Sequence, residues 1–234
     1  MSHGVKLKVW GDYALFSRPE MKAERVSYDV PTPSAARGIL EAIYWKPQIR
    51  WVIDRIHVLH PISFTNIRRN EVAAPGKSGH KIPTTTARAV MRSGTGSLGI
   101  AIEEFRQQRA SMVLKNVAYV VEASFIVLDA KERDGSTLAD PAAKHLRQFN
   151  DRARAGQCRH TPCLGCREFP AYFEIIEEAI PVSEITGTND LGFMLYDIDF
   201  KDNMTPLFYR PVMENGVIDV QEYWRKAPSH RDLR

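Results

Sequence analysis

The first sixty residues show the spacing of a strand, a helix and a second strand. Apolar and polar residues alternate over 5–10, which is the period of a half-exposed β-strand. Thr32 is a favourable N-cap, Pro33 suits the first helical position, and apolar residues then recur every three or four positions. Pro47 disfavours helix at the residue before it. We therefore predict a strand, a helix that begins at Pro33, and a long strand over 51–64 that bends at its internal proline.

The middle of the chain carries the strongest strand pattern. Residues 113–128 are rich in β-branched and aromatic side chains. Asp140 suits the N-cap of a polar helix. From residue 181 onward short strands alternate with turns, and Asn215–Gly216 is typical of a tight hairpin. The predicted elements are a short helix over 100–108, strands over 113–128 and 168–179, and a polar helix over 141–155.

The order of these elements, β-α-β-β-α-β followed by a β-rich tail, predicts an α+β protein. It is the ferredoxin-like, or split βαβ, arrangement that RNA-recognition modules also use. We expect this domain over 1–180 and a small antiparallel β domain over 181–234. Because folds of this class host many activities, the arrangement alone indicates no function.

The composition is that of an ordinary globular protein. The chain has 234 residues, of which 44% are hydrophobic and 26% charged, enough for a sizeable core. No apolar run approaches the ~20 residues of a membrane span, and the N-terminus lacks the apolar stretch of a signal peptide. The three cysteines all lie within 158–166, so we expect no disulfide framework and a cytoplasmic location.

The net charge of +4 is distributed unevenly along the chain. Residues 1–125 contain 18 basic and 10 acidic residues, whereas 126–234 contain 14 basic and 18 acidic ones. Two stretches, 66–99 and 144–167, each contain six basic residues and one acidic residue, and the first is rich in Gly, Ser and Pro, as expected of a long loop. One interpretation is contact with a phosphate backbone, and the other is a solvated surface that keeps the protein soluble. The candidate RNA-binding residues of the first stretch are Arg68, Arg69, Arg88 and Arg92.

Five segments, in their order and spacing, resemble one known protein family. They cover residues 11–16, 26–46, 53–61, 108–123 and 165–169. The longest specific stretch reads YDVPTPSAARGILEAIYWKP. Over nearly its whole length the sequence resembles the d branch of the CRISPR-associated Cas-five family, found in subtype I-C systems. The resemblance implies a ferredoxin-like domain with a small C-terminal β domain, as the element order also predicts.

The resemblance implies an endoribonuclease that cleaves CRISPR repeat precursor RNA without a metal or another cofactor. Such a protein remains bound to the crRNA and joins other CRISPR-associated subunits in a surveillance complex. Two alternatives stay open. The protein could be a non-catalytic scaffold that binds the crRNA end, or a nonspecific binder of duplex nucleic acid, duplex DNA included.

Metal-free cleavage uses the 2′-hydroxyl of the RNA as nucleophile, so the protein must supply acid–base groups and a cation. The resemblance assigns the family's catalytic tyrosine to Tyr44 and its lysine to Lys115, and Asn116 stands where some members have a histidine. Because an amide does not exchange protons near neutral pH, Asn116 leaves the acid–base work to the other two and favours the scaffold alternative. We expect Tyr44 and Lys115 to approach each other at one end of the sheet, with Lys46 in contact with a phosphate. Without the resemblance, the tyrosine would be an ordinary core-edge residue and the lysine a solvated strand residue.

The segment CRHTPCLGC has the ligand types of a zinc site. Cys158, His160, Cys163 and Cys166 would supply three thiolates and one imidazole. All four lie in one short loop, however, and no second ligand pair closes the site from elsewhere. We therefore expect free thiols and no bound metal. The glycine-rich stretch over 93–99 has neither the lysine nor the spacing of a phosphate-binding P-loop.

Overall fold

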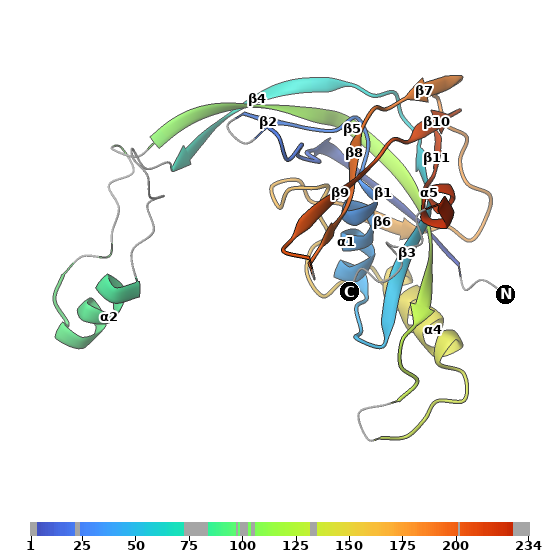
Figure 1. The fold of residues 1–234 in the computed structure, drawn as a ribbon, viewed down its shortest axis with the longest axis horizontal. Coiled ribbons are helices and arrows are strands. Elements are labelled where there is room, and N and C mark those ends of the chain that lie inside the picture. The colour runs from blue at the N-terminus through green and yellow to red at the C-terminus, as the bar shows by residue number, and fades with distance from the viewer. Residues whose placement is uncertain are drawn as a thin grey trace. The chain divides into compact units, whose positions relative to one another are not determined.

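The computed structural model describes residues 4–21, 24–72, 84–96, 98, 103, 106–131, 135–200 and 202–226. The chain forms two compact units (Figure 1). The larger unit combines Met1–Thr65 with Met112–Arg234, and the smaller one is Asn66–Ser111. Among the described residues, no helix is both long and apolar enough to cross a membrane.

One large antiparallel sheet dominates the larger unit. Its strand order is β6-β1-β5-β3-β11-β10-β7, every pair along this path is antiparallel, and β2 and β4 also pair with β5. The strands are β1 Val5–Ala14, β2 Arg25–Val26, β3 Ile49–Val58, β4 Phe64–Val72, β5 Arg106–Val127, β6 Tyr172–Ile175, β7 Thr188–Asp190, β10 Val212–Glu214 and β11 Val217–Asp219. A separate two-stranded ribbon contains β8 Met194–Asp199 and β9 Thr205–Tyr209. The helices are α1 Pro33–Ile43, α2 Thr84–Ser93, α4 Pro141–Arg154 and α5 Val220–Lys226. The prediction of an α+β protein is therefore confirmed.

Local signals placed the two main helices correctly. Thr32 caps α1 by accepting a hydrogen bond from the Ala35 backbone N–H at 3.1 Å. Asp140 caps α4 in the same way, through the Ala143 N–H at 2.9 Å. In both helices a proline follows the cap, where its missing N–H costs no hydrogen bond. The Asn215–Gly216 hairpin is also confirmed, since both residues adopt positive φ between β10 and β11.

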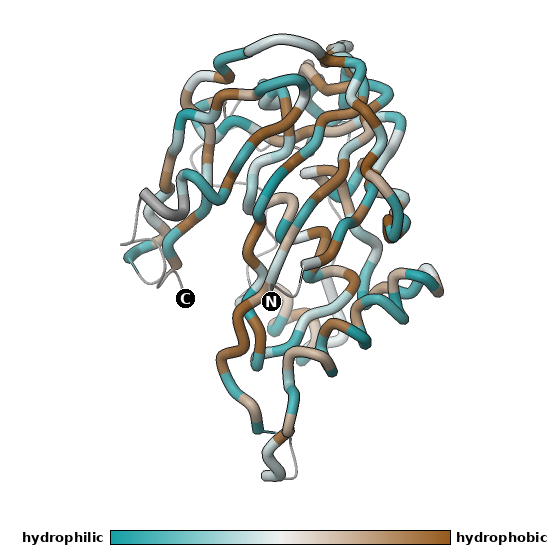
Figure 2. Tube along the Cα trace, turned by 90° about the vertical axis from the view of Figure 1, so that its right-hand side faces the viewer, coloured by the Kyte–Doolittle hydropathy of each residue, from teal (hydrophilic) through white to brown (hydrophobic). Residues whose placement is uncertain are grey.

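Helices α1 and α4 pack on one face of the sheet. Phe149 of α4 contacts Trp51 of β3 with ring centroids 4.9 Å apart, and Trp51 lies opposite Phe125 of β5. Because side chains alternate between faces, Phe125 shares its face with Val121 and Tyr119, which lie opposite Leu7 and Val9. These side chains are buried and form the core, and Figure 2 shows the alternating hydrophobic and hydrophilic positions along the strands.

The stretch 66–99 is not the loop that its composition suggested, where the structure describes it. Strand β4 continues to Val72, and α2 occupies Thr84–Ser93, whereas residues 73–83 lie outside the described residues. The strand forms because it pairs with β5, a partner that composition cannot reveal. Helix α2 was not predicted, because the Gly, Ser and Pro content of the stretch indicated a loop, and the helix buries no residue.

Other boundaries also differ from the sequence prediction. The strand expected over 51–64 is divided, because β3 ends at Val58 and Pro61 lies in the connection to β4. The strand over 168–179 shrinks to β6, which pairs with Leu7–Trp10 of β1. Residues 106–108 of the expected short helix belong to β5, and the rest of that segment, apart from Glu103, lies outside the described part of the chain. Helix α5 was not predicted. The domain boundary expected between residues 180 and 181 stays a prediction.

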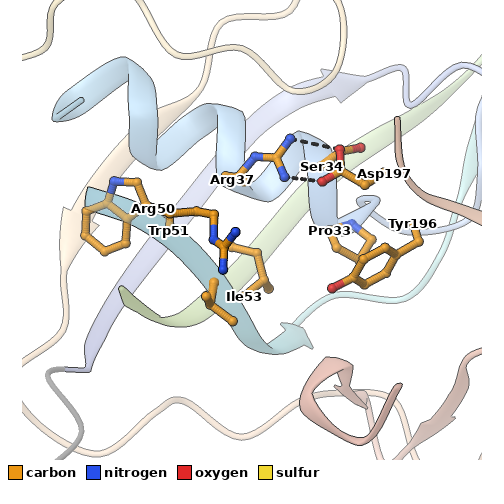
Figure 3. Close-up of a pocket in the computed structure, with 9 residues that line it drawn as sticks. Pro33, Ser34, Arg37, Arg50, Trp51, Ile53, Tyr196 and Asp197 are labelled. Atoms are coloured by element: carbon orange, nitrogen blue, oxygen red, sulfur yellow. Dashed lines mark hydrogen bonds and ion pairs between the residues drawn. The ribbon is translucent and has the colours of Figure 1, made fainter. Parts of the chain in front are cut away.

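A buried ion pair ties the C-terminal ribbon to α1 (Figure 3). Arg37 of α1 forms two hydrogen bonds with the Asp197 carboxylate of β8, one of them 2.8 Å long. Burial lowers the pKa of the Arg37 guanidinium, but the hydrogen bonds and negative charge of Asp197 outweigh this effect and raise the pKa overall. The arginine is therefore charged, and the ion pair links elements 160 residues apart.

Candidate active site

Tyr44 lies immediately after the last turn of α1 and is almost completely buried, with 1% of its surface exposed. Its backbone N–H donates to the Leu40 carbonyl at 2.9 Å. Its own carbonyl accepts a hydrogen bond from the Trp51 indole N–H at 3.0 Å. Both ends of the residue are therefore fixed, one by α1 and the other by β3.

The Tyr44 hydroxyl makes two short contacts with α4. It donates to Gln148 Oε1 at 2.6 Å and lies 2.7 Å from His145 Nδ1. A hydroxyl has one hydrogen, so while it donates to Gln148 its oxygen accepts the Nδ1–H of His145. A neutral imidazole in that tautomer carries its lone pair on Nε2, which is the form of a general base.

Lys144 and His145 are adjacent residues of α4, so a lysine and a histidine lie side by side on a helix here, whereas the resemblance implies a lysine on a strand. His145 belongs to the buried face of α4, with 4% of its surface exposed, and Lys144 is half-buried. The resemblance assigns the family's lysine to Lys115, with Asn116 beside it, and does not indicate the Lys144–His145 pair. The signal that could have found it is the Lys144–His145 dipeptide at the start of the second basic stretch.

Cationic side chains of that second basic stretch surround the end of α1. The Arg152 guanidinium donates to the Ile43 carbonyl at 3.2 Å and lies over the Tyr44 ring at 5.5 Å. Arg159 donates its backbone N–H to the Ala42 carbonyl at 2.7 Å. Cations at a helix C-terminus neutralise its partial negative charge and satisfy its last carbonyls. These contacts help to hold the segment 144–159 against the end of α1 that carries Tyr44.

Lys115 and Asn116 lie far from Tyr44 along β5. Phe125 of this strand contacts His145, with ring centroids 6.4 Å apart, and Lys115 precedes Phe125 by ten residues. Ten residues of strand extend over about 30 Å. The structure therefore does not bring Lys115 to Tyr44, contrary to our expectation.

Asn116 has a backbone role at its position. Its φ is +50°, in the left-handed region that asparagine tolerates better than most residues. Its carbonyl accepts a hydrogen bond from His60 Nδ1 at 2.9 Å. Lys115 is exposed, and its N–H donates to the Ser63 carbonyl at 2.9 Å.

The candidate RNA-binding residues have different surroundings. Lys46 is exposed, two residues after Tyr44. In the smaller unit Arg68, Arg88 and Arg92 are exposed, and the last two are spaced to share one face of α2. Arg69 instead points to its own unit, where it donates to Ser111 Oγ at 2.7 Å and lies 3.9 Å from Glu71.

All three cysteines are free thiols. Burial raises the pKa of the Cys163 thiol, and the neighbouring Cys166 adds to this effect. Within the described ranges, no group of three or more His, Cys, Asp or Glu side chains is placed to hold a metal ion. Gly165 of the same segment has φ +86°, and a Cβ atom there would lie 2.0 Å from the Leu15 carbonyl oxygen.

The chain is similar to known proteins over nearly its whole length. The Cas5d family model, described as "CRISPR-associated protein (Cas_Cas5)", matches residues 4–221. The chain is 49% identical over 230 residues to the CRISPR pre-crRNA endoribonuclease Cas5d of Mannheimia succiniciproducens, covering 96% of this chain and 97% of the relative. It is 46% identical to the protein of the same name from Thermus thermophilus, covering 97% of each chain. A solved CRISPR-associated protein superposes with a TM-score of 0.62 at 26% identity, covering 93% of this chain and 91% of the other. By the family match and by both relatives, the chain belongs to the Cas5d family of CRISPR-associated proteins.

Proposed function

We propose that this protein is a metal-independent endoribonuclease that cleaves CRISPR precursor RNA at a site made by Tyr44, Lys144 and His145. The main support for this proposal is the 2.7 Å contact between the Tyr44 hydroxyl and His145 Nδ1. Lys144 is the neighbour of His145 in sequence. Near full-length similarity to two relatives named pre-crRNA endoribonucleases supports the substrate. This assignment replaces Lys115 and Asn116 with Lys144 and His145.

The three side chains supply what attack by a 2′-hydroxyl requires. His145 Nε2 takes the proton from the 2′-hydroxyl, whose oxygen then bonds to phosphorus. The P–O5′ bond breaks, Tyr44 gives its proton to O5′, and the tyrosine regains a proton from His145 Nδ1. The Lys144 ammonium stabilises the negative charge of the phosphorane. The products are a 2′,3′-cyclic phosphate and a 5′-hydroxyl.

The burial of this site has a consequence for catalysis. Tyr44 and His145 are both buried, whereas Lys144 and Gln148 are half-buried and mark the side that faces solvent. The phosphate must therefore enter past Lys144 and Gln148, and RNA binding must open the contact between α1 and α4. Lys46, two residues after Tyr44, and Arg147, next to Gln148, are exposed cations that can draw the phosphate in.

Cleavage of repeat RNA is expected to persist in excess EDTA. The acid, the base and the cation of the proposed mechanism are all protein side chains, so chelation removes nothing that the reaction needs. The measurement is gel analysis of end-labelled repeat RNA, together with enzymatic identification of the product ends. Strict dependence on Mg²⁺ with a 3′-hydroxyl product would contradict the mechanism.

We further propose that the large unit has the ferredoxin-like arrangement. Helix α1 connects β1 to β3, and α4 connects β5 to β6. In the order β6-β1-β5-β3, each of these pairs is separated by one strand of the other pair. Two interleaved, split βαβ units of this kind support the assignment.

Salt dependence is expected to report on the smaller unit. If Arg68, Arg88 and Arg92 contact RNA phosphates, each substitution by Ala should reduce the slope of log affinity against log salt by about 0.7–0.9. Arg69→Ala is the matched control, because that side chain is paired with Ser111 and Glu71. An unchanged slope in the triple variant would place these cations away from the RNA.

The same salt titrations, repeated with competitor duplex DNA, test whether the protein prefers CRISPR RNA to duplex DNA. We propose that the protein stays on the crRNA and contributes to a complex with other CRISPR-associated subunits, in the cytoplasm. Free thiols at all three cysteines favour such a reducing compartment. Equal competition by unrelated duplex DNA would favour a nonspecific binder instead.

A further inference from the structure

We propose that the sheet face opposite α1 and α4 binds one unpaired base of single-stranded RNA, with Trp10 and Tyr172 as its stacking surface. The proposal rests on the proposed function in that RNA is the ligand. It adds a base-binding site on the other side of the sheet from Tyr44 and His145.

Two aromatic rings form a supported surface on this face. Trp10 of β1 lies directly opposite Tyr172 of β6, and their rings are stacked with centroids 5.9 Å apart and planes 27° apart. Trp10 packs against a small apolar cluster that includes Leu59, Ala118 and Val120, so its position is fixed. Tyr172 is 62% exposed and leaves ring surface free for a third ring. Bases of single strands stack on aromatic side chains with little regard to sequence.

Positive charge lies beside the two rings. Lys6 and Lys8 share the face of Trp10 because strand residues two apart point the same way. The Lys8 ammonium lies 5.0 Å from the centre of the Trp10 ring and 2.7 Å from a Glu174 carboxylate oxygen. An ion pair this exposed contributes little stability, so an RNA phosphate can replace the carboxylate.

A groove of about 410 Å³ next to Trp10 supplies groups that can contact the edge of a base. Asp12, His60 and Asn116 line it, and the volume is within the range of small-ligand sites. His60 Nδ1 donates to the Asn116 carbonyl, so the neutral ring has its acceptor at Nε2. A stacking surface beside fixed donors and acceptors is how proteins recognise unpaired bases of RNA.

The test is fluorescence anisotropy with a labelled single-stranded RNA of about ten nucleotides that cannot form the repeat hairpin. Tyr172→Ala is expected to weaken binding by about 5- to 100-fold, the range for loss of one stacking partner. Tyr172→Phe keeps the ring and is expected to bind as the parent does. Phe193→Ala removes another exposed aromatic ring and is the matched control.

Cleavage of the full repeat, measured at saturating enzyme, separates this proposal from the proposed function. Tyr172→Ala is expected to cut at the parental rate, because the ring lies on the opposite face from His145. Parental affinity of Tyr172→Ala for the single strand, or an equal loss in Phe193→Ala, would overturn the stacking site. A parent that does not cleave would overturn the proposed function, while the binding comparison would still decide the stacking site.

Discussion

His145→Ala is expected to slow repeat cleavage by about 10²–10⁴-fold, the usual contribution of a positioned acid–base group. Tyr44→Phe keeps the buried ring and removes only the hydroxyl, and we expect a loss in the same range. Binding of uncleaved repeat should change far less, because groups that act on developing charge contribute little in the ground state. The measurement is single-turnover cleavage beside a binding isotherm for each variant. Since the two groups share one hydrogen bond, the double variant should lose much less than the product of the single losses.

Lys115→Ala is the sharpest comparison for this experiment. Lys115 lies about 30 Å along β5 from Phe125, the residue that contacts His145. The Lys115→Ala variant should therefore cut at the parental rate. His160→Ala removes an exposed histidine and controls for imidazole loss in general. Slow cleavage by Lys115→Ala, combined with parental cleavage rates for His145→Ala and Tyr44→Phe, would place the catalytic site at the other end of β5.

Arg37→Met is expected to lower the free energy of unfolding by about 3–5 kcal/mol, the usual cost of leaving one member of a buried ion pair alone. Only 9% of the Asp197 side chain is exposed, so its carboxylate would stay buried without the guanidinium. The pair links α1 to β8, and its loss should loosen the ribbon from the helix that positions Tyr44. The measurement is equilibrium unfolding in urea, at a pH where the carboxylate is ionised.

Two variants make this result specific. Arg37→Met combined with Asp197→Leu removes both charges and should recover most of the lost stability, because apolar replacements of buried ion pairs are often neutral or better. Arg210→Met breaks the exposed pair with Asp190 and should change stability little. Equal losses in Arg37→Met and Arg210→Met would show that burial is not what gives the first pair its importance.

The sequence predicted those features that depend on neighbouring residues. Thr32 with Pro33 and Asp140 with Pro141 start their helices as expected, because a cap and the first turn lie within four residues of each other. Asn215–Gly216 likewise needs only its own tolerance of positive φ. The strand over 113–128 was found for a similar reason, since its side chains suit a pleated, half-buried surface whichever strands it pairs with.

Strand and helix boundaries that depend on a distant partner were missed. Strand β4 was read as loop because its residues are polar, yet it pairs with β5. Composition contains no information about that partner. Helix α2 buries no residue, and the Gly, Ser and Pro content of its stretch indicated a loop instead.

In the candidate site, too, local features were found from the sequence and long-range contacts were not. Tyr44 was recognised from its motif, and Lys144 was counted in a basic stretch, but only the fold places His145 against the tyrosine hydroxyl, 101 residues away in sequence. Lys115 was assigned to the site by the resemblance, which gives no distances, and ten residues of β5 separate it from Phe125, which contacts His145. The sequence by itself determined which residue types and local elements are available. The tertiary structure decided which of them meet, because the packing of α4 on the end of α1 is a long-range choice made by buried surface and by the carbonyls that must be satisfied there.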